Sequence, residues 1–201
     1  GGFYWNVDWI EGNYMFIWHK RATQNKVERA IHIETKMTMD KIAEMVEEIL
    51  EKTGFNPRNL VLEITETSRI ADYDIAYDVM SRLRLHGIKL SIDDFGVGSA
   101  SMETLLRLPF DELKIDRAFI ARMHDDQKAR AISQMMIAFG KQTRITVVAE
   151  GVEDQANMKL LRDLGCEIVQ GYHISKPLEK EKFSQFQSDN QREFSKQALI
   201  G

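Results

Sequence analysis

The sequence contains one cysteine, Cys166, and three prolines among 201 residues. A single cysteine excludes an internal disulfide and is typical of a reducing compartment. Cys166 stands among apolar residues, so we expect a buried thiol rather than a nucleophile. A basic surplus is also missing, because 27 lysines and arginines stand against 31 aspartates and glutamates, a formal net charge of −4. This balance argues against nonspecific binding to a DNA or RNA duplex.

Long hydrophobic runs are absent as well. No stretch reaches the roughly 18 apolar residues of a transmembrane helix, and no signal peptide is recognisable. We therefore expect a soluble, cytoplasmic chain without direct membrane insertion, or the cytoplasmic part of a larger protein. With 43% hydrophobic and 29% charged residues, the chain is long enough for one domain with a full core.

Strand-like and helix-like segments alternate along the chain. Two aromatic-rich runs, 3–9 and 14–20, flank a Gly-Asn turn and predict an antiparallel hairpin. Hydrophobic spacing then predicts strands at 30–33, 60–64, 88–92, 112–115, 145–149 and 168–169, and helices at 39–53, 70–86, 101–107, 118–142, 154–164 and 179–197. About eight strands in parallel βαβ units favour an α/β fold closed into a barrel over an open doubly wound sheet.

The central strand ends in two adjacent acids, Asp93 and Asp94. Gly96 and Gly98 follow, so the chain leaves the strand through a turn that tolerates unusual backbone angles. At a frayed strand end both carboxylates can reach one cavity and hold a hard divalent cation. The alternative is an acidic turn in which the pair only caps the next helix.

Polar residues end five successive predicted strands: Glu63, Asp93 with Asp94, Lys114, Glu150 and Gln170. In a barrel these carboxyl ends meet on one rim. Four carboxylates at one place repel each other unless a cation or a proton intervenes. The pattern therefore predicts a two-metal site in which Lys114 is a balancing charge, and the chemistry implied is hydrolysis of a phosphate ester.

Five segments resemble motifs of the EAL family, which are bacterial phosphodiesterases acting on cyclic di-GMP. They are Glu-Ile-Thr-Glu at 63–66, Asp-Asp-Phe-Gly-Val-Gly at 93–98, Leu-Lys-Ile-Asp at 113–116, Val-Val-Ala-Glu-Gly-Val-Glu at 147–153 and Gln-Gly-Tyr at 170–172. Five motifs in order are far more specific than any one short pattern. We interpret 1–201 as a single EAL-like domain, with a clear match over 54–187 and an atypical hairpin and strand over 1–35.

The resemblance implies a modified TIM (β/α)8-type barrel with an antiparallel first strand, here with a reduced N-terminal helical lobe. It implies two Mg²⁺ or Mn²⁺ ions that activate a water to open cyclic di-GMP to linear pGpG. The implied metal ligands are Glu63, Asp93, Asp94 and Glu150, and the implied catalytic residues are Lys114, Glu63 and Glu150, with Lys114 orienting or deprotonating the water. The implied supporting or substrate-binding residues are Gln170, Glu153 and Glu66. For Glu66 and Glu153, a solvated acid at a helix start is the alternative.

The family's Glu-Ala-Leu signature is absent. Ile17 stands where the family has a metal-binding glutamate, and His32 stands where it has a metal-binding asparagine. Only residues 22–29 fill the interval of the family's helical lobe. His19, His32 and Glu34 could supply substitute ligands, although a structural histidine is the more common case.

Two functions stay open. One is a phosphodiesterase with an altered metal shell, and the other is a catalytically degenerate domain that acts as a cyclic di-GMP receptor or as a protein-partner-binding regulator. The resemblance also implies a homodimer and a regulatory domain in a parent protein. Val97 and Ser99 replace the threonine and tyrosine of the family's loop, which weakens the case for dimerisation through that loop.

Overall fold

The computed structural model describes residues 6–10, 14–23, 26–34, 39–65, 72–96, 102–176, 182 and 186. These contain one sheet with strands in chain order: β1 (Asn6–Ile10), β2 (Tyr14–Thr23), β3 (Lys26–Glu34), β4 (Leu60–Thr65), β5 (Lys89–Phe95), β6 (Glu112–Ile115), β7 (Thr146–Ala149) and β8 (Ile168–Val169). Strands β1 and β2, and β2 and β3, pair antiparallel, while every later pair is parallel.

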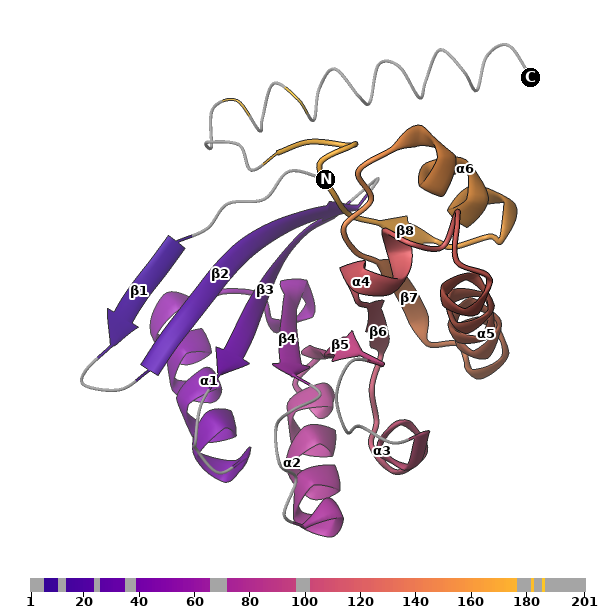
Figure 1. The fold of residues 1–201 in the computed structure, drawn as a ribbon. Helices are drawn as coiled ribbons and strands as arrows, with labels where there is room; N and C mark the ends of the chain where they lie inside the picture. The colour runs from indigo at the N-terminus through magenta and orange to yellow at the C-terminus, as the bar shows by residue number, and fades with distance from the viewer. Residues whose placement is uncertain are drawn as a thin grey trace, which may run out of the picture.

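Helices follow most of the parallel strands, as the alternating pattern predicts. They are α1 (Met39–Thr53), the short 3-10 helix η1 (Pro57–Asn59), α2 (Tyr73–Leu85), α3 (Met102–Arg107), α4 (Arg117–Ile120), α5 (Gln127–Thr143) and α6 (Gln155–Asp163). Figure 1 shows the larger helices arranged around the outside of the central strands β4 to β7. This layered α/β arrangement is that of a TIM-barrel-like fold.

The eight predicted strands are present, and their order is that of a barrel. Among the described residues, however, no ladder joins β8 back to β1. Strand β8 has only two residues, so it offers few backbone groups to a further neighbour. We expected a closed barrel. In the described part of the chain, the strands follow the order of a barrel, but β8 and β1 are not hydrogen-bonded to each other.

Alternation along the central strands separates an apolar outer face from a polar inner one. Leu62, Leu90 and Leu113 are fully buried in the hydrophobic cluster beneath the helices. Their neighbours Glu63 and Ser91 are equally buried although they are polar. Since successive side chains of a strand point to opposite faces, the helices cover one face and the polar residues gather on the other.

The helix predicted over 118–142 is two helices, α4 and α5. The side chain of Asp126 accepts hydrogen bonds from the backbone N–H groups of Lys128 and Ala129 and begins α5. An N-terminal cap of this kind satisfies donors that have no partner inside the helix. The prediction of one uninterrupted helix was wrong. The helical spacing of apolar residues continues across the turn between α4 and α5, and it does not reveal that Asp126 begins a new helix.

Cys166 packs against the core, as its apolar neighbours indicate. Burial raises the pKa of its thiol to about 11, so the thiolate needed of a nucleophile is scarce near neutral pH. No helix in the described part of the chain has the length and apolar character that a membrane crossing needs. Apart from residues 182 and 186, the helix predicted over 179–197 lies outside the described residues.

Candidate functional site

The site is built on the polar inner face of the sheet. Glu63 of β4 is paired in register with Ser91 of β5, which in turn is paired with Glu112 of β6. The Ser91 hydroxyl donates to Glu112 at 2.9 Å, a buried hydrogen bond. Asp93 and Lys114 stand two residues further along β5 and β6, so they share this face and lie nearer the carboxyl ends of the strands.

A β-bulge explains how two adjacent acids serve one site. Ile92 pairs with Leu113 and Phe95 pairs with Ile115, so Asp93 and Asp94 together oppose one residue of β6. Asp94 takes a left-handed backbone conformation with φ of 55°. In a regular strand the two carboxylates would point to opposite faces, whereas a bulge redirects one of them.

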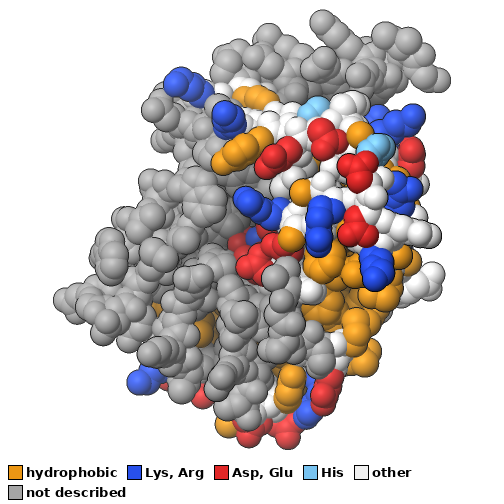
Figure 2. All heavy atoms as spheres, viewed as in Figure 1, with side chains coloured by type: hydrophobic (Ala, Val, Ile, Leu, Met, Phe, Trp, Pro, Cys, Tyr) orange, Lys and Arg blue, Asp and Glu red, His pale blue; other side chains and the backbone are white. Residues whose placement is uncertain are grey.

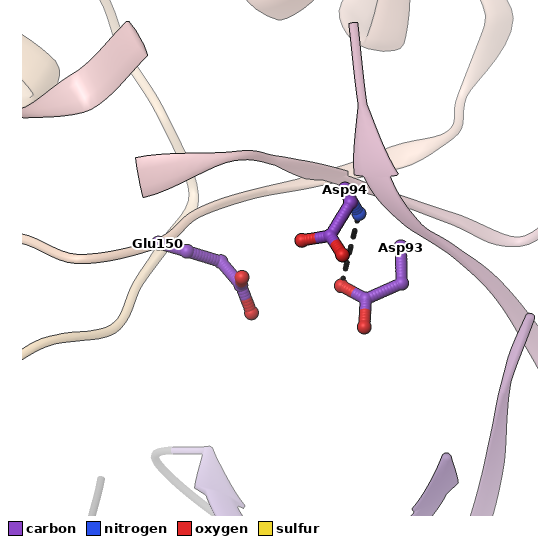
Figure 3. Close-up of side chains that lie close together, drawn as sticks. All are labelled: Asp93, Asp94 and Glu150. Carbon is purple, nitrogen blue, oxygen red and sulfur yellow. Dashed lines mark hydrogen bonds between the residues drawn. The ribbon is translucent and has the colours of Figure 1, made fainter. Parts of the chain in front are cut away.

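Asp93, Asp94 and Glu150 converge on one space. Each offers one carboxylate oxygen, and these oxygens lie within 4.8 Å of one another. Figure 3 shows the three side chains facing that space, with the Asp94 backbone N–H donating to Asp93 at 3.1 Å. Oxygen-only donors at this spacing fit a hard divalent cation such as Mg²⁺ or Mn²⁺.

Lys114 lies at the centre of the acids. Its Nζ is 2.7 Å from Glu150, 2.8 Å from Asp93 and 3.2 Å from Glu63. The lysine side chain is only 4% exposed, so these ion pairs are shielded from solvent. Glu63 therefore belongs to the site through the ammonium of Lys114 rather than through the group of three converging carboxylates.

The carboxylates keep Lys114 protonated. Burial alone would lower the pKa of its ammonium, but Glu63, Glu150 and Asp93 outweigh burial and hold that pKa well above its ordinary value. A lysine in this state donates hydrogen bonds and does not accept a proton near neutral pH. In the metal-free chain Lys114 is therefore a hydrogen-bond donor to the three carboxylates.

Two of the acids, Asp94 and Glu150, have raised pKa values, which favour the neutral form of a carboxyl group. Burial raises the pKa of the Asp94 carboxyl, and the neighbouring Asp93 and Asp116 raise it further. Burial also raises the pKa of Glu150, although the Lys114 ammonium works against it. Carboxylates that resist ionisation beside one another are stabilised by a bound cation.

We expect Mn²⁺ affinity to fall as pH is lowered, beginning above the ordinary aspartate pKa of 3.8, because ligands must be deprotonated. The metal-free protein should respond in the opposite direction. A raised carboxyl pKa means that the folded state holds the proton more tightly, so these groups weaken the fold as pH rises from 3.8 through the raised values. Calorimetric titrations with Mn²⁺ test the pH dependence of the affinity, and urea unfolding tests that of the unfolding free energy. A Mn²⁺ affinity that stays constant down to about pH 4 would contradict the coupling between metal binding and carboxyl protonation.

Asp116 is a site neighbour that we did not single out from the sequence. Its carboxyl lies near that of Asp94 and raises the Asp94 pKa. It also accepts from the Ala118 N–H at 2.7 Å and thereby caps α4. Asp116 could have been predicted from the sequence as a site residue, because it directly follows β6 and stands two residues after Lys114.

The loops after β7 and β8 are tied together beside Glu150. The backbone N–H of Gln170 donates to Ala149 at 2.8 Å, and that of Val152 donates to Gln170 at 3.0 Å. The Gln170 side-chain oxygen is buried and accepts no hydrogen bond from the described residues. Glu153 is exposed and lies outside the contacts that join the acids to Lys114.

The predicted residues of the N-terminal strands are placed by backbone register alone. Ile17 is paired with His32, and His32 is paired with Glu63. The two positions where the family's glutamate and asparagine are replaced therefore stand in one row with Glu63. Strands β2 and β3 are separated only by residues 24 and 25. Glu66 lies outside the described residues.

Comparison with known proteins agrees with this geometry. The EAL domain model matches residues 14–177. The cyclic di-GMP phosphodiesterase NbdA of Pseudomonas aeruginosa is 42% identical over 139 residues, which are 68% of this chain and 18% of NbdA. The chain spans between 16% and 36% of the length of the curated relatives it matches.

Two solved structures extend the comparison. The EAL domain of DcpA from Mycobacterium smegmatis has a TM-score of 0.74 and 30% identity, covering 80% of this chain and 72% of that one. BlrP1 of Klebsiella pneumoniae, in a complex with manganese and cyclic di-GMP, has a TM-score of 0.62 and 30% identity, covering 72% and 37%. From the motifs, the fold and these matches together, the chain belongs to the EAL domain family.

Proposed function

We propose that the chain is a metal-dependent phosphodiesterase module that hydrolyses cyclic di-GMP to linear pGpG. The observation that carries the proposal is the convergence of Asp93, Asp94 and Glu150 on one space beside the buried Lys114. Such a set of like charges weakens a fold unless cations bind there. NbdA is a cyclic di-GMP phosphodiesterase, and BlrP1 binds manganese together with this dinucleotide.

The proposed division of roles follows from the geometry. Asp93, Asp94 and Glu150 would hold Mg²⁺ or Mn²⁺. Glu63, which contacts the ammonium of Lys114, would be a further ligand if that contact is exchanged for a metal ion. A bound pair of such ions supplies a nucleophilic water and neutralises phosphoryl charge. Lys114, whose ammonium lies within 3.2 Å of three of these acids, would orient that water or a phosphoryl oxygen by donating a hydrogen bond.

The second candidate function is a cyclic di-GMP receptor or partner-binding regulator without turnover. It is favoured by one observation, the row in which Ile17 and His32 stand beside Glu63 in place of oxygen ligands. Loss of ligands on that side would lower the affinity for one of the two ions more than it would lower the stability of the fold.

Turnover of cyclic di-GMP with Mn²⁺, followed by chromatography for pGpG, separates the two functions. We expect product from the wild type, no product from Lys114→Ala, and full product from Lys52→Ala, whose exposed lysine in α1 pairs with Glu48. Absence of product together with tight binding of the dinucleotide would favour the receptor. Neither product nor binding would contradict both functions.

The larger context is also a proposal. Since the chain spans only between 16% and 36% of its curated relatives, we propose that it works beside a regulatory domain in a cytoplasmic parent protein and pairs as a homodimer. Sedimentation velocity of the domain with and without cyclic di-GMP tests the dimer.

A further inference from the structure

Two buried glutamates flank one serine on the inner face of the sheet. Glu63, Ser91 and Glu112 are paired in register across β4, β5 and β6, and all three side chains are buried. A serine hydroxyl has a single hydrogen to donate. Ser91 donates it to Glu112 at 2.9 Å, so this serine distinguishes one of its two neighbouring glutamates from the other.

The two glutamates also differ in their distance from Lys114. Glu112 precedes Lys114 by two residues on β6, so both side chains lie on one face of the sheet and their Cα atoms are roughly 7 Å apart. Glu63 stands two strands away on β4. It is nevertheless Glu63 that contacts the ammonium, at 3.2 Å, together with Asp93 and Glu150. The acid that stands nearer to Lys114 by backbone position is bonded to Ser91 instead.

The Lys114 ammonium has no donor to spare for a further acid. It carries three hydrogens, and Glu63, Asp93 and Glu150 match that number. A fourth carboxylate at this depth would compete strongly, because opposite charges attract each other more where solvent is excluded. Figure 2 shows that acidic side chains also lie among basic ones near the centre of this side of the molecule, so such competition extends to the surface.

We propose that Ser91 is a positioning residue, whose hydroxyl holds Glu112 toward β5 and so reserves the ammonium of Lys114 for the site. The inference rests on the proposed phosphodiesterase function. In that function Asp93 and Glu150 bind a cation, and Lys114 donates to the water or to a phosphoryl oxygen. A glutamate released next to Lys114 would accept that hydrogen bond in place of the substrate.

The variant Ser91→Ala tests the proposal through turnover. We expect kcat for cyclic di-GMP to fall by roughly 10- to 100-fold, the usual effect of losing a residue that orients a site group. Mn²⁺ affinity should not fall, because Asp93, Asp94 and Glu150 are unchanged. The matched control is Ser133→Ala, which should keep the wild-type kcat, since Ser133 is equally buried but donates to a backbone oxygen of α5. A wild-type kcat in Ser91→Ala would overturn the proposal.

The variant Glu112→Gln separates positioning from packing. The glutamine oxygen still accepts from Ser91, and without a charge it attracts the ammonium less, so this variant alone should turn over like the wild type. In the double variant Ser91→Ala, Glu112→Gln, we expect kcat to return most of the way to the wild-type value. A kcat as low in the double variant as in Ser91→Ala would contradict the proposal, because Ser91 would then act by a route other than Glu112.

Crystal structures of the metal-free variants give a readout that needs no turnover. In Ser91→Ala the Glu112 carboxylate should move to hydrogen-bond distance from Lys114 Nζ and displace Glu63, the most distant of the three partners. A Glu112 that keeps its wild-type position would overturn the positioning role. If Ser91→Ala does not fold, Ser91→Cys makes the same comparison, since a thiol is a weaker donor of similar size. A wild type without turnover would contradict the proposed hydrolysis, while these structures would still decide the role of Ser91.

Discussion

Replacement of Lys114 by methionine is expected to lower the unfolding free energy of the metal-free protein by roughly 3–5 kcal/mol, the usual effect of breaking a buried ion pair from one side. The ammonium lies within 3.2 Å of three carboxylates and is 4% exposed. Without it, Glu63, Asp93 and Glu150 would remain buried with no cation between them. Urea unfolding of both proteins at equal ionic strength measures the difference.

A matched control is Lys52→Met, because Lys52 is 70% exposed and pairs with Glu48 on one helix. An exposed pair contributes less than about 1 kcal/mol, so this variant should unfold almost like the wild type. Saturating Mg²⁺ should restore part of the stability lost in Lys114→Met, because the ion binds only the folded state. Equal stability of the two variants would mean that the acids do not depend on Lys114.

The double variant Asp93→Asn, Asp94→Asn is expected to lose Mn²⁺ binding by at least on the order of 100-fold, since even outer neighbours of metal ligands contribute 10- to 100-fold. Two of the three converging carboxylates become neutral amides of nearly the same shape. The unfolding free energy should change little, because Glu63 and Glu150 still contact Lys114. Isothermal calorimetry with Mn²⁺ and a parallel urea titration give the two quantities.

The control for this pair changes the same charge elsewhere. Asp125→Asn with Asp163→Asn removes two acids from exposed positions on the surface, and it should leave Mn²⁺ binding unchanged. If the site variant bound Mn²⁺ as tightly as this control, Asp93 and Asp94 would not be ligands, and this result would contradict the proposed two-metal site. Turnover of cyclic di-GMP should disappear in the site variant alone.

Local patterns predicted most of the parallel part of the fold. Strand β6 occupies the predicted residues 112–115, and α1 occupies the predicted 39–53. These segments were predictable because hydrophobic periodicity and terminating glycines act within a few residues. The helix expected over 118–142 failed for a local reason as well, since the capping role of Asp126 competes with continued helical spacing.

The N-terminal region was less predictable. The run 21–28 is polar and did not suggest strand, yet β2 and β3 extend through most of it. Pairing between neighbouring strands overrides such weak local preferences, because β propensity depends mainly on context. The register that places Ile17, His32 and Glu63 in one row is likewise a property of the assembled sheet.

By itself, the sequence determined the order of polar residues at successive strand ends, and with it which acids could share a rim with Lys114. Only the tertiary structure decided that Lys114 contacts three of the acids and that Asp94 joins Asp93 on one side of β5. The reason is that local sequence patterns determine where each strand ends. The contacts between the acids and Lys114 depend instead on a bulge, on a residue with a left-handed backbone conformation and on the register between strands far apart in the chain.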